Sequence, residues 1–298
     1  MADIVLLDGG MGPELIHRAG DRPTPLWSTT VMMEHPGLVR AVHGDYFAAG
    51  ATVATTNTYC VHRDRLEGTG YEDRFAALHA QALDEASAAR GAAHGGRIAG
   101  SIGPLVASYR PETHPPHAEA VARYAEIARI LGPSVDLIIC ETVASLAHAR
   151  AVLEGAKAAG KPVWLSVTVD DEDGSRLRSG EAVADVATLA RDGGAAAILA
   201  NCSAPEAMPA ALAAMKDAGL PFGAYANGFT RITKEFLKDK PTVDALEARG
   251  DLTPEAYARH VMGWVDIGAT IVGGCCETGP AHIAELRRAL EAAGHRIV

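Results

Sequence analysis

Eight short apolar runs alternate with helical stretches along this chain, and this alternation limits the possible folds more than any other feature. Each run is rich in valine, isoleucine and alanine and ends at glycine, asparagine, threonine or an acid. Nearly continuous apolarity is typical of parallel strands that are buried on both faces. The expected strands are Ile4–Leu7, Thr52–Thr55, Arg97–Gly100, Leu137–Cys140, Val163–Thr168, Ala196–Leu199, Gly223–Tyr225 and Thr270–Val272.

Amphipathic stretches between these runs predict the helices, for example Tyr71–Gly91, His117–Leu131 and Pro280–Gly294. Several end at a glycine, as helix C-caps commonly do. No composition break or flexible linker divides the chain. Although 298 residues exceed the usual domain size, α/β barrels reach about 200–250 residues or more around one core. We therefore expect an α/β protein with a single (β/α)₈ TIM barrel over residues 1–298.

Composition excludes several classes of partner. The chain has 27 Lys plus Arg against 37 Asp plus Glu, a net charge of −10 that would repel nucleic acid and anionic lipid. The apolar run near the N-terminus is too short for a signal-peptide core or a membrane span, so a cytoplasmic protein is expected. No protein partner is evident. The five cysteines are an odd number, which argues against a disulfide framework and leaves metal binding, catalysis or burial.

Function in such a barrel is expected at the C-terminal ends of the strands. Three long inserts, Leu105–His117, Asp170–Glu181 and Leu237–Asp251, follow strands and should lie at that face. The strand-end motifs are Asp8–Gly12, Thr56–Cys60, Ser101–Pro104, Glu141–Val143, Thr168–Gly174, Asn201–Ser203, Ala226–Gly228 and Gly273–Thr278.

Three cysteines at these ends predict a metal site. Cys202 follows the sixth strand, and Cys275 and Cys276 follow the eighth, so the two segments should begin about 10 Å apart. Side chains reaching inward could meet at zinc, with one tetrahedral position left open, as in catalytic sites. Adjacent cysteines can share a metal only where the strand is broken, and Gly273 and Gly274 would permit such a break.

Other interpretations of the cysteines remain open. Cys140 is expected to be simply buried and Cys60 to pack at the rim. Cys275 and Cys276 could instead form a disulfide, or the turn before Pro280 could bind phosphate. A fourth ligand, such as Cys60, would give a closed zinc site in a non-catalytic barrel.

Two acids at buried strand ends are candidates for ligand binding. Asp8 and Glu141 should be costly to bury unless they pair internally or bind a cation such as an ammonium group. The acidic run Asp170–Gly174 is expected to be a solvated loop. His43, His79, His148 and His282 fall on helical stretches, where we expect ordinary helix-surface or interhelix residues.

The motifs together resemble the homocysteine S-methyltransferase family. The resemblance covers nearly the whole chain, in order, and "NC" followed by "GGCC" is its most specific part. The matching stretches are "LLDGGMGPEL", "LWS", "VHGDYFAAGATVATTNTY", "GSIGP", "CET", "NCSAPE" and "GGCCET".

This resemblance implies roles for particular residues. Cys202, Cys275 and Cys276 match the family's zinc ligands, and the homocysteine sulfur would be the fourth. Asp8 and Glu141 match the positions that bind the homocysteine amino group, and the adjacent Gly9 is also expected to bind the substrate. Asn57 and Thr58, in "TNTY", match a strand end that lines the pocket in the homocysteine-binding module of methionine synthases. Asn227 matches the asparagine of the family's Pro-Asn pair and is expected to bind substrate, but Ala226 stands where the family usually has proline.

The implied reaction is methyl transfer from a small onium donor to homocysteine, forming methionine. A free thiol has a pKa near 8.5, and zinc coordination would deprotonate it. We expect S-methylmethionine or S-adenosylmethionine as donor, because "NCSAPE" is similar to the branch that uses S-methylmethionine. A betaine is the alternative, and neither cobalamin nor methyltetrahydrofolate is expected. Tyr59, Tyr109 and Phe229 could hold the donor cation by cation–π contact.

Overall fold

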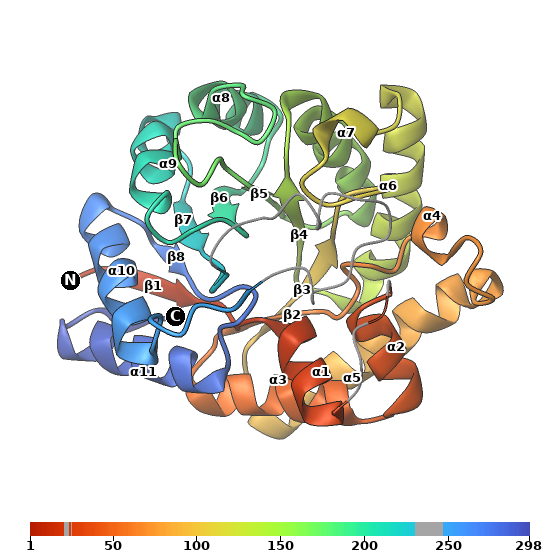
Figure 1. The fold of residues 1–298 in the computed structure, drawn as a ribbon, viewed down its shortest axis with the longest axis horizontal. Coiled ribbons are helices and arrows are strands. Elements are labelled where there is room, and N and C mark those ends of the chain that lie inside the picture. Colours follow the sequence, from red (N-terminus) through yellow and green to blue (C-terminus); the bar gives the residue numbers. More distant parts are fainter. Residues whose placement is uncertain (21–23, 25, 230–246) are drawn as a thin grey trace.

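The computed structural model describes residues 1–20, 24, 26–229 and 247–298. Its strands form one parallel sheet in the order β2-β3-β4-β5-β6-β7-β8-β1-β9, and they lie at the centre of Figure 1. The eight predicted strands are confirmed. Their bounds are β1 Asp3–Leu6, β2 Val53–Thr55, β3 Arg97–Ile102, β4 Leu137–Val143, β5 Val163–Val167, β6 Ala197–Asn201, β7 Phe222–Tyr225 and β8 Ile271–Val272.

The barrel closes between β1 and β2. A parallel bridge pairs Leu7 with Val53. The Asp8 N–H donates to the Val53 carbonyl at 3.0 Å, and the Thr52 N–H donates to the Leu6 carbonyl at 2.7 Å. These bonds leave no free edge between the first two strands and confirm the predicted (β/α)₈ architecture.

Helices surround the strands (Figure 1). Side-chain caps begin two of them: the Ser145 hydroxyl accepts from the His148 N–H, and the Thr253 hydroxyl accepts from the Ala256 N–H. The α-helices are α1 Met11–Ala19, α2 Ser28–Glu34, α3 Leu38–Ala49, α4 Arg63–Leu66, α5 Phe75–Ala93, α6 His117–Leu131, α7 Leu146–Ala156, α8 Val183–Asp192, α9 Met208–Met215, α10 Pro254–Ile267 and α11 Pro280–Ala292. The 3₁₀ turns are η1 Glu72–Arg74, η2 Pro111–Thr113, η3 Gly132–Ser134, η4 Lys157–Ala159 and η5 Lys216–Ala218.

Differences from the expected elements are local. The helix expected from Tyr71 begins at Phe75, because η1 precedes it. A ninth strand, β9 Arg296–Ile297, pairs with β1 outside the barrel. Most of the expected insert Leu237–Asp251 lies outside the described residues. None of the described helices is long and apolar enough to cross a membrane.

Two apolar layers hold the barrel together. The larger lies between the strands and the helices. The smaller includes Leu7, Val53, Leu137, Trp164 and Ile271, whose side chains pack together from different strands. Side chains that point inward from every strand fill the interior of a barrel of this kind. A ligand pocket is therefore expected at the C-terminal ends of the strands.

Candidate active site and metal centre

One pocket brings together most of the predicted strand-end residues. It measures about 780 Å³ with its open mouth included, and its wall contains Asp8, Asn57, Glu141, Cys202 and Cys275. These residues come from segments that are distant in sequence and meet only because parallel strands end at the same rim.

The three predicted metal ligands converge at this pocket. The Sγ atoms of Cys202, Cys275 and Cys276 all lie within 4.8 Å of one another, and those of Cys202 and Cys275 are 2.7 Å apart. Among the described residues, this is the one group of three or more Cys, His, Asp or Glu side chains close enough to share a metal ion. Clustered thiols with Zn–S bonds near 2.3 Å are a common zinc donor set, so the side chains fit the predicted metal.

The backbone after β8 explains how neighbouring cysteines reach one point. The strand ends at Val272, and the Thr278 N–H donates to the Cys275 carbonyl at 3.2 Å, closing a turn. Glu277 in this turn has φ 62°. Neither Gly273 nor Gly274 has positive φ. A Cβ on them would lie 2.5 Å from Leu7 Cβ and 2.0 Å from Thr278 Oγ1, respectively, so these glycines are required for close packing.

Hydrogen bonding makes the three thiols unequal. Bonds from the Cys275 and Cys276 thiols lower the pKa of Cys202 well below its usual range. The same bonds with Cys202 raise the pKa of Cys275 and Cys276. A divalent cation bound by all three sulfur atoms would favour the thiolate form of each.

The other cysteines are separate from this cluster. Cys140 is fully buried in β4, and burial raises the pKa of its thiol. Cys60 lies in the pocket wall but is not within reach of the three clustered sulfur atoms. All five cysteines are free, so Cys275 and Cys276 form no disulfide with each other.

The turn before Pro280 was the alternative candidate for phosphate binding. There, His282 Nδ1 accepts from the Gly279 N–H at 3.2 Å, which occupies one of the backbone donors at the start of α11.

Asp8 is a buried carboxylate at the end of β1. Its Oδ2 accepts from the Thr55 N–H at 2.7 Å and its Oδ1 from the Thr55 hydroxyl at 2.9 Å. Burial raises the pKa of Asp8 to about 7 despite these two bonds, and the charge of Glu141 adds to the rise.

Glu141 lies within β4, which extends beyond its predicted end. The register with β5 shifts between Cys140 and Val143, and Thr142 has φ 58°, so a local irregularity turns this strand end. The Ser101 hydroxyl donates to Glu141 Oε1 at 2.5 Å and the Tyr225 hydroxyl to Oε2 at 3.0 Å. Burial raises the pKa of Glu141 to about 7, and the Cys202 charge adds to this.

Gly9 and Asn57 also lie in the pocket wall. A Cβ on Gly9 would lie 2.1 Å from the Thr278 carbonyl oxygen, so only glycine fits there. The Asn57 amide is held by α2: the Ser28 hydroxyl donates to its Oδ1 at 2.5 Å, and its Nδ2 donates to the Ser28 carbonyl at 3.2 Å.

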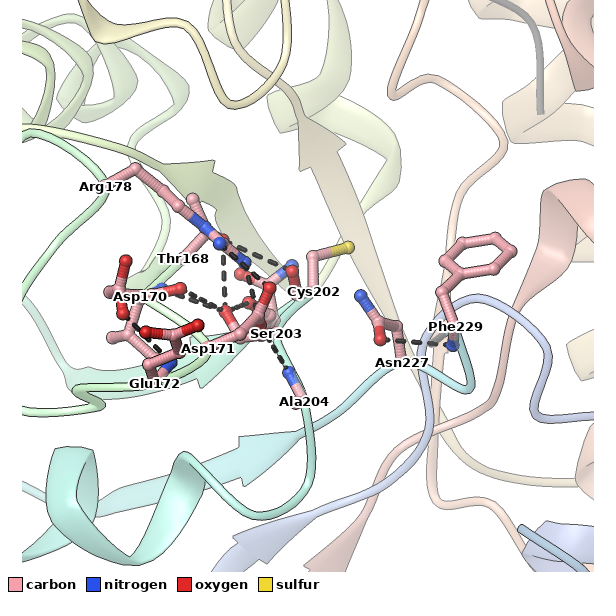
Figure 2. A network of polar contacts seen from close by, with 12 residues as sticks. Thr168, Asp170, Asp171, Glu172, Arg178, Cys202, Ser203, Ala204, Asn227 and Phe229 are labelled. Atoms are coloured by element: carbon pink, nitrogen blue, oxygen red, sulfur yellow. Dashed lines mark hydrogen bonds and ion pairs between the residues drawn. The ribbon is translucent and has the colours of Figure 1, made fainter. Parts of the chain in front are cut away.

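Thr58 and Asn227 lie beside the pocket rather than in its wall. The Thr58 hydroxyl donates to the Ser101 carbonyl at 2.7 Å, and Thr56, two residues earlier, lies in the wall. The Asn227 N–H donates to the Ser203 carbonyl at 3.1 Å, and its Oδ1 accepts from the Phe229 N–H at 3.3 Å (Figure 2).

Ala226, which precedes Asn227, has a contact that proline could not make. Its N–H donates to the Tyr257 hydroxyl at 3.0 Å. The same hydroxyl lies 2.8 Å from the Gly273 carbonyl oxygen and can donate to it. Tyr257 of α10 therefore links the end of β7 to the segment that carries Cys275 and Cys276.

Aromatic side chains surround the cysteines. Tyr109 and Phe229 pack on Cys202, with Trp27 against the same cluster. Trp27 and Tyr59 have ring centroids 6.4 Å apart, and Trp27, Tyr59 and Tyr109 all line the pocket. The sequence indicated Tyr59, Tyr109 and Phe229 but not Trp27. Trp27 lies between α1 and α2, away from any strand end in the sequence, and reaches the pocket only in the folded chain.

Several polar residues that hold the site were also missed. Thr55, Ser101 and Tyr225 fix the two carboxylates, and Asn201, next to Cys202, bonds Thr142, next to Glu141. Their shared signal is a polar side chain near the end of an otherwise apolar strand. His43, His79 and His148 are buried between helices, which agrees with the interhelix position expected for some of the histidines.

The chain is similar to known proteins over nearly its whole length. The family model described as homocysteine S-methyltransferase matches residues 5–290. A homocysteine S-methyltransferase from Escherichia coli is 31% identical, covering 96% of this chain and 94% of its own length. YbgG from Bacillus subtilis, of the same description, is 27% identical, with 95% and 93% covered.

A solved structure gives the same result. The homocysteine methyltransferase MmuM from Escherichia coli, in its metallated form, superposes with a TM-score of 0.80 at 29% identity, and 96% of each chain is covered. On the family match, the full-length relatives and this shared fold, the chain belongs to the homocysteine S-methyltransferase family.

Proposed function

We propose that this enzyme transfers a methyl group from a small onium donor to homocysteine, with zinc held by Cys202, Cys275 and Cys276. Methyl transfer to homocysteine, which yields methionine, is the activity of its family. The observation that carries the proposal is the meeting of three sulfur atoms and two buried carboxylates in one pocket.

The donor set supports zinc. When bound, zinc would act as a Lewis acid that lowers the pKa of a coordinated substrate thiol and makes it nucleophilic at neutral pH. The chain supplies three sulfur ligands, which leaves a fourth position for the substrate. A general base is not needed for a thiol activated in this way, and among the described residues no histidine lines the pocket to serve as one.

Asp8 and Glu141 are proposed to bind the homocysteine ammonium group. Both carboxylates are buried, and no Lys or Arg in the described part of the chain forms an ion pair with either. An ammonium group placed between them would supply the missing positive charge and lower both raised pKa values. Their position in the same wall as the cysteines would hold the substrate thiol beside the metal ligands.

The remaining predicted residues have proposed supporting roles. Gly9 and Asn57 are proposed to contact homocysteine from the pocket wall. Thr58 would act through Ser101 and Thr56, and Asn227 through the turn that follows β7.

A sulfonium donor is proposed over a betaine. The aromatic rings of Trp27, Tyr59 and Tyr109 beside the cysteines could attract an onium cation through contacts of about 0.5–2 kcal/mol. Such a donor carries a methyl group already activated by positive charge, so a nucleophilic thiol can displace it in one step.

The proposal is tested by two measurements on the purified protein. About one zinc per chain is expected, together with methionine formed from homocysteine and a sulfonium donor. A protein that binds homocysteine but turns over without any bound metal would refute the zinc assignment. A protein with zinc that forms no methionine from any onium donor would refute the donor class.

A further inference from the structure

The insert between β5 and α8 forms hydrogen bonds with the backbone around Cys202 at two points (Figure 2). The Thr168 hydroxyl lies 3.2 Å from the Cys202 carbonyl oxygen and can donate to it. Two residues beyond Cys202, the Ala204 N–H donates to Asp171 Oδ1 at 2.8 Å. The acidic run that the sequence predicted to be a solvated loop is therefore partly engaged with the metal-ligand segment.

Arg178 joins these two contacts. Its Nη1 and Nη2 donate to the two carboxylate oxygens of Asp171, each at 2.9 Å, in a bidentate pair. Its Nε donates to Thr168 Oγ1 at 3.3 Å. The Arg178 and Asp171 side chains are only 13% and 21% exposed, so solvent screens this pair less than an ordinary surface ion pair.

Cys202 has a backbone conformation that needs such support. Its φ of 48° lies in the left-handed region, which is unfavourable for a residue other than glycine. The Ser203 hydroxyl adds a contact on the same segment, accepting from the Val169 N–H at 2.9 Å. These bonds fix the peptide groups around Cys202 and thereby direct its sulfur toward Cys275 and Cys276.

Arg178 has a second contact with the site. Its guanidinium carbon lies 5.6 Å from the centre of the Tyr109 ring, and Tyr109 packs on Cys202. The same arginine therefore contacts the Cys202 segment through Thr168 and Asp171, and the aromatic wall through Tyr109.

We propose that Arg178 and Asp171 are positioning residues that hold Cys202 in its ligand geometry and so set the affinity of the site for zinc. This inference rests on the proposed zinc site. Neither Arg178 nor Asp171 lines the pocket, so both would act through the Cys202 segment. Only the bidentate fork of arginine can bind both Asp171 oxygens and still donate to Thr168, which lysine cannot do.

The test measures zinc affinity by chelator competition for Arg178→Ala, Arg178→Lys, Asp171→Asn and Thr168→Val. Partners that orient metal ligands typically contribute 10- to 100-fold in affinity, so we expect a loss of about tenfold or more in Arg178→Ala and only partial rescue in Arg178→Lys. The matched control is Arg176→Ala, an exposed arginine of the same insert that pairs with Asp173 and contacts Gly180. It should stay within about twofold of wild type.

Cobalt substitution gives a second readout, because the intensity of sulfur-to-cobalt charge-transfer bands reports how many sulfur atoms bind. We expect weaker bands in Arg178→Ala than in Arg176→Ala at equal cobalt, with both proteins folded by circular dichroism. If Arg178→Ala does not fold, Asp171→Asn decides, since it weakens the bidentate pair with Arg178 at one atom; it should bind zinc more weakly than Arg176→Ala.

The outcomes separate this inference from the proposed function. Wild-type protein that binds zinc, with folded variants that all bind it within twofold of wild type, would overturn the positioning role alone. Wild-type protein that binds no zinc would overturn the metal site and this inference with it.

Discussion

Asn201 of β6 and Thr142 of β4 exchange two hydrogen bonds at the rim of the barrel. The Thr142 N–H donates to Asn201 Oδ1, and Asn201 Nδ2 donates to Thr142 Oγ1, both at 3.0 Å. From the strand between them, the Ser166 hydroxyl donates to Asn201 Oδ1 at 2.9 Å. Because Asn201 precedes Cys202 and Thr142 follows Glu141, this pair links the sulfur cluster to the carboxylate that we propose binds the amino group.

Replacing Asn201 with alanine should therefore weaken both parts of the site at once. We expect zinc affinity and homocysteine affinity each to fall by about tenfold, and stability to fall by about 1–3 kcal/mol because buried partners lose their bonds. Chelator competition, calorimetry and urea unfolding measure the three quantities. Unchanged affinities in a folded but less stable variant would reduce Asn201 to a structural role.

The metal ligands should be separable from the other cysteines. Changing Cys202, Cys275 or Cys276 to alanine should abolish stoichiometric zinc and activity, since two sulfur ligands hold the ion poorly. Cys140→Ala, in the interior of β4, should keep its zinc. Metal analysis after dialysis checks both. Normal zinc content in a Cys275→Ala, Cys276→Ala double variant contradicts the assignment.

Asp8→Asn and Glu141→Gln should weaken homocysteine binding much more than zinc binding. A charge-assisted hydrogen bond contributes about 1.5–3 kcal/mol, which is roughly tenfold or more in affinity. Since both carboxyls have pKa values of about 7, wild-type affinity should also fall as the pH drops below 7 and they take up protons. Calorimetry between pH 6 and pH 8 tests this. Equal affinity in wild type and both variants would argue against the ammonium role.

The same two substitutions should stabilise the protein without substrate at alkaline pH. Burial raises the pKa of each carboxyl from about 4 in the unfolded chain to about 7 in the folded protein. The free energy of unfolding therefore falls as the pH rises above the unfolded-state pKa, and it stops falling once the pH exceeds the folded-state pKa. At pH 8, Asp8→Asn should be more stable by on the order of 1–4 kcal/mol, and the difference should shrink toward pH 5. Urea titrations at both pH values measure it.

The donor should be a sulfonium compound. Homocysteine is incubated separately with S-methylmethionine, S-adenosylmethionine, glycine betaine or methyltetrahydrofolate, without cobalamin, and methionine is measured. We expect turnover with at least one sulfonium. Activity with the folate alone, or with betaine but neither sulfonium, would contradict this expectation.

The barrel could be predicted from sequence because its signal is local. Buried parallel strands show continuous apolar runs, such as Leu137–Cys140 in β4, and helices such as His117–Leu131 show their amphipathic pattern within a few turns. The two residues of β9 carry no such pattern. They become a strand because β1 offers a free edge outside the barrel, which is a property of the folded molecule.

The site was predictable in part for the same reason. Cys202, Cys275, Asp8 and Glu141 stand directly at or next to strand ends, and the barrel brings those ends together. Arg178 does not stand at a strand end, and its role depends on how the insert folds back onto the neighbouring strand end. Hydrogen bonds between segments far apart in sequence leave no periodic trace.

The hydrogen bond between Ala226 and Tyr257 has an evolutionary consequence. Proline at position 226 would have no N–H, and the Tyr257 hydroxyl would lose this donor while keeping its carbonyl acceptors. A hydroxyl at position 257 is therefore favoured more strongly when residue 226 is not proline. In an alignment of relatives, the two positions should co-vary: lineages that acquired a non-proline residue before this asparagine should have retained tyrosine on the helix, and phenylalanine should be tolerated mainly where the proline remains.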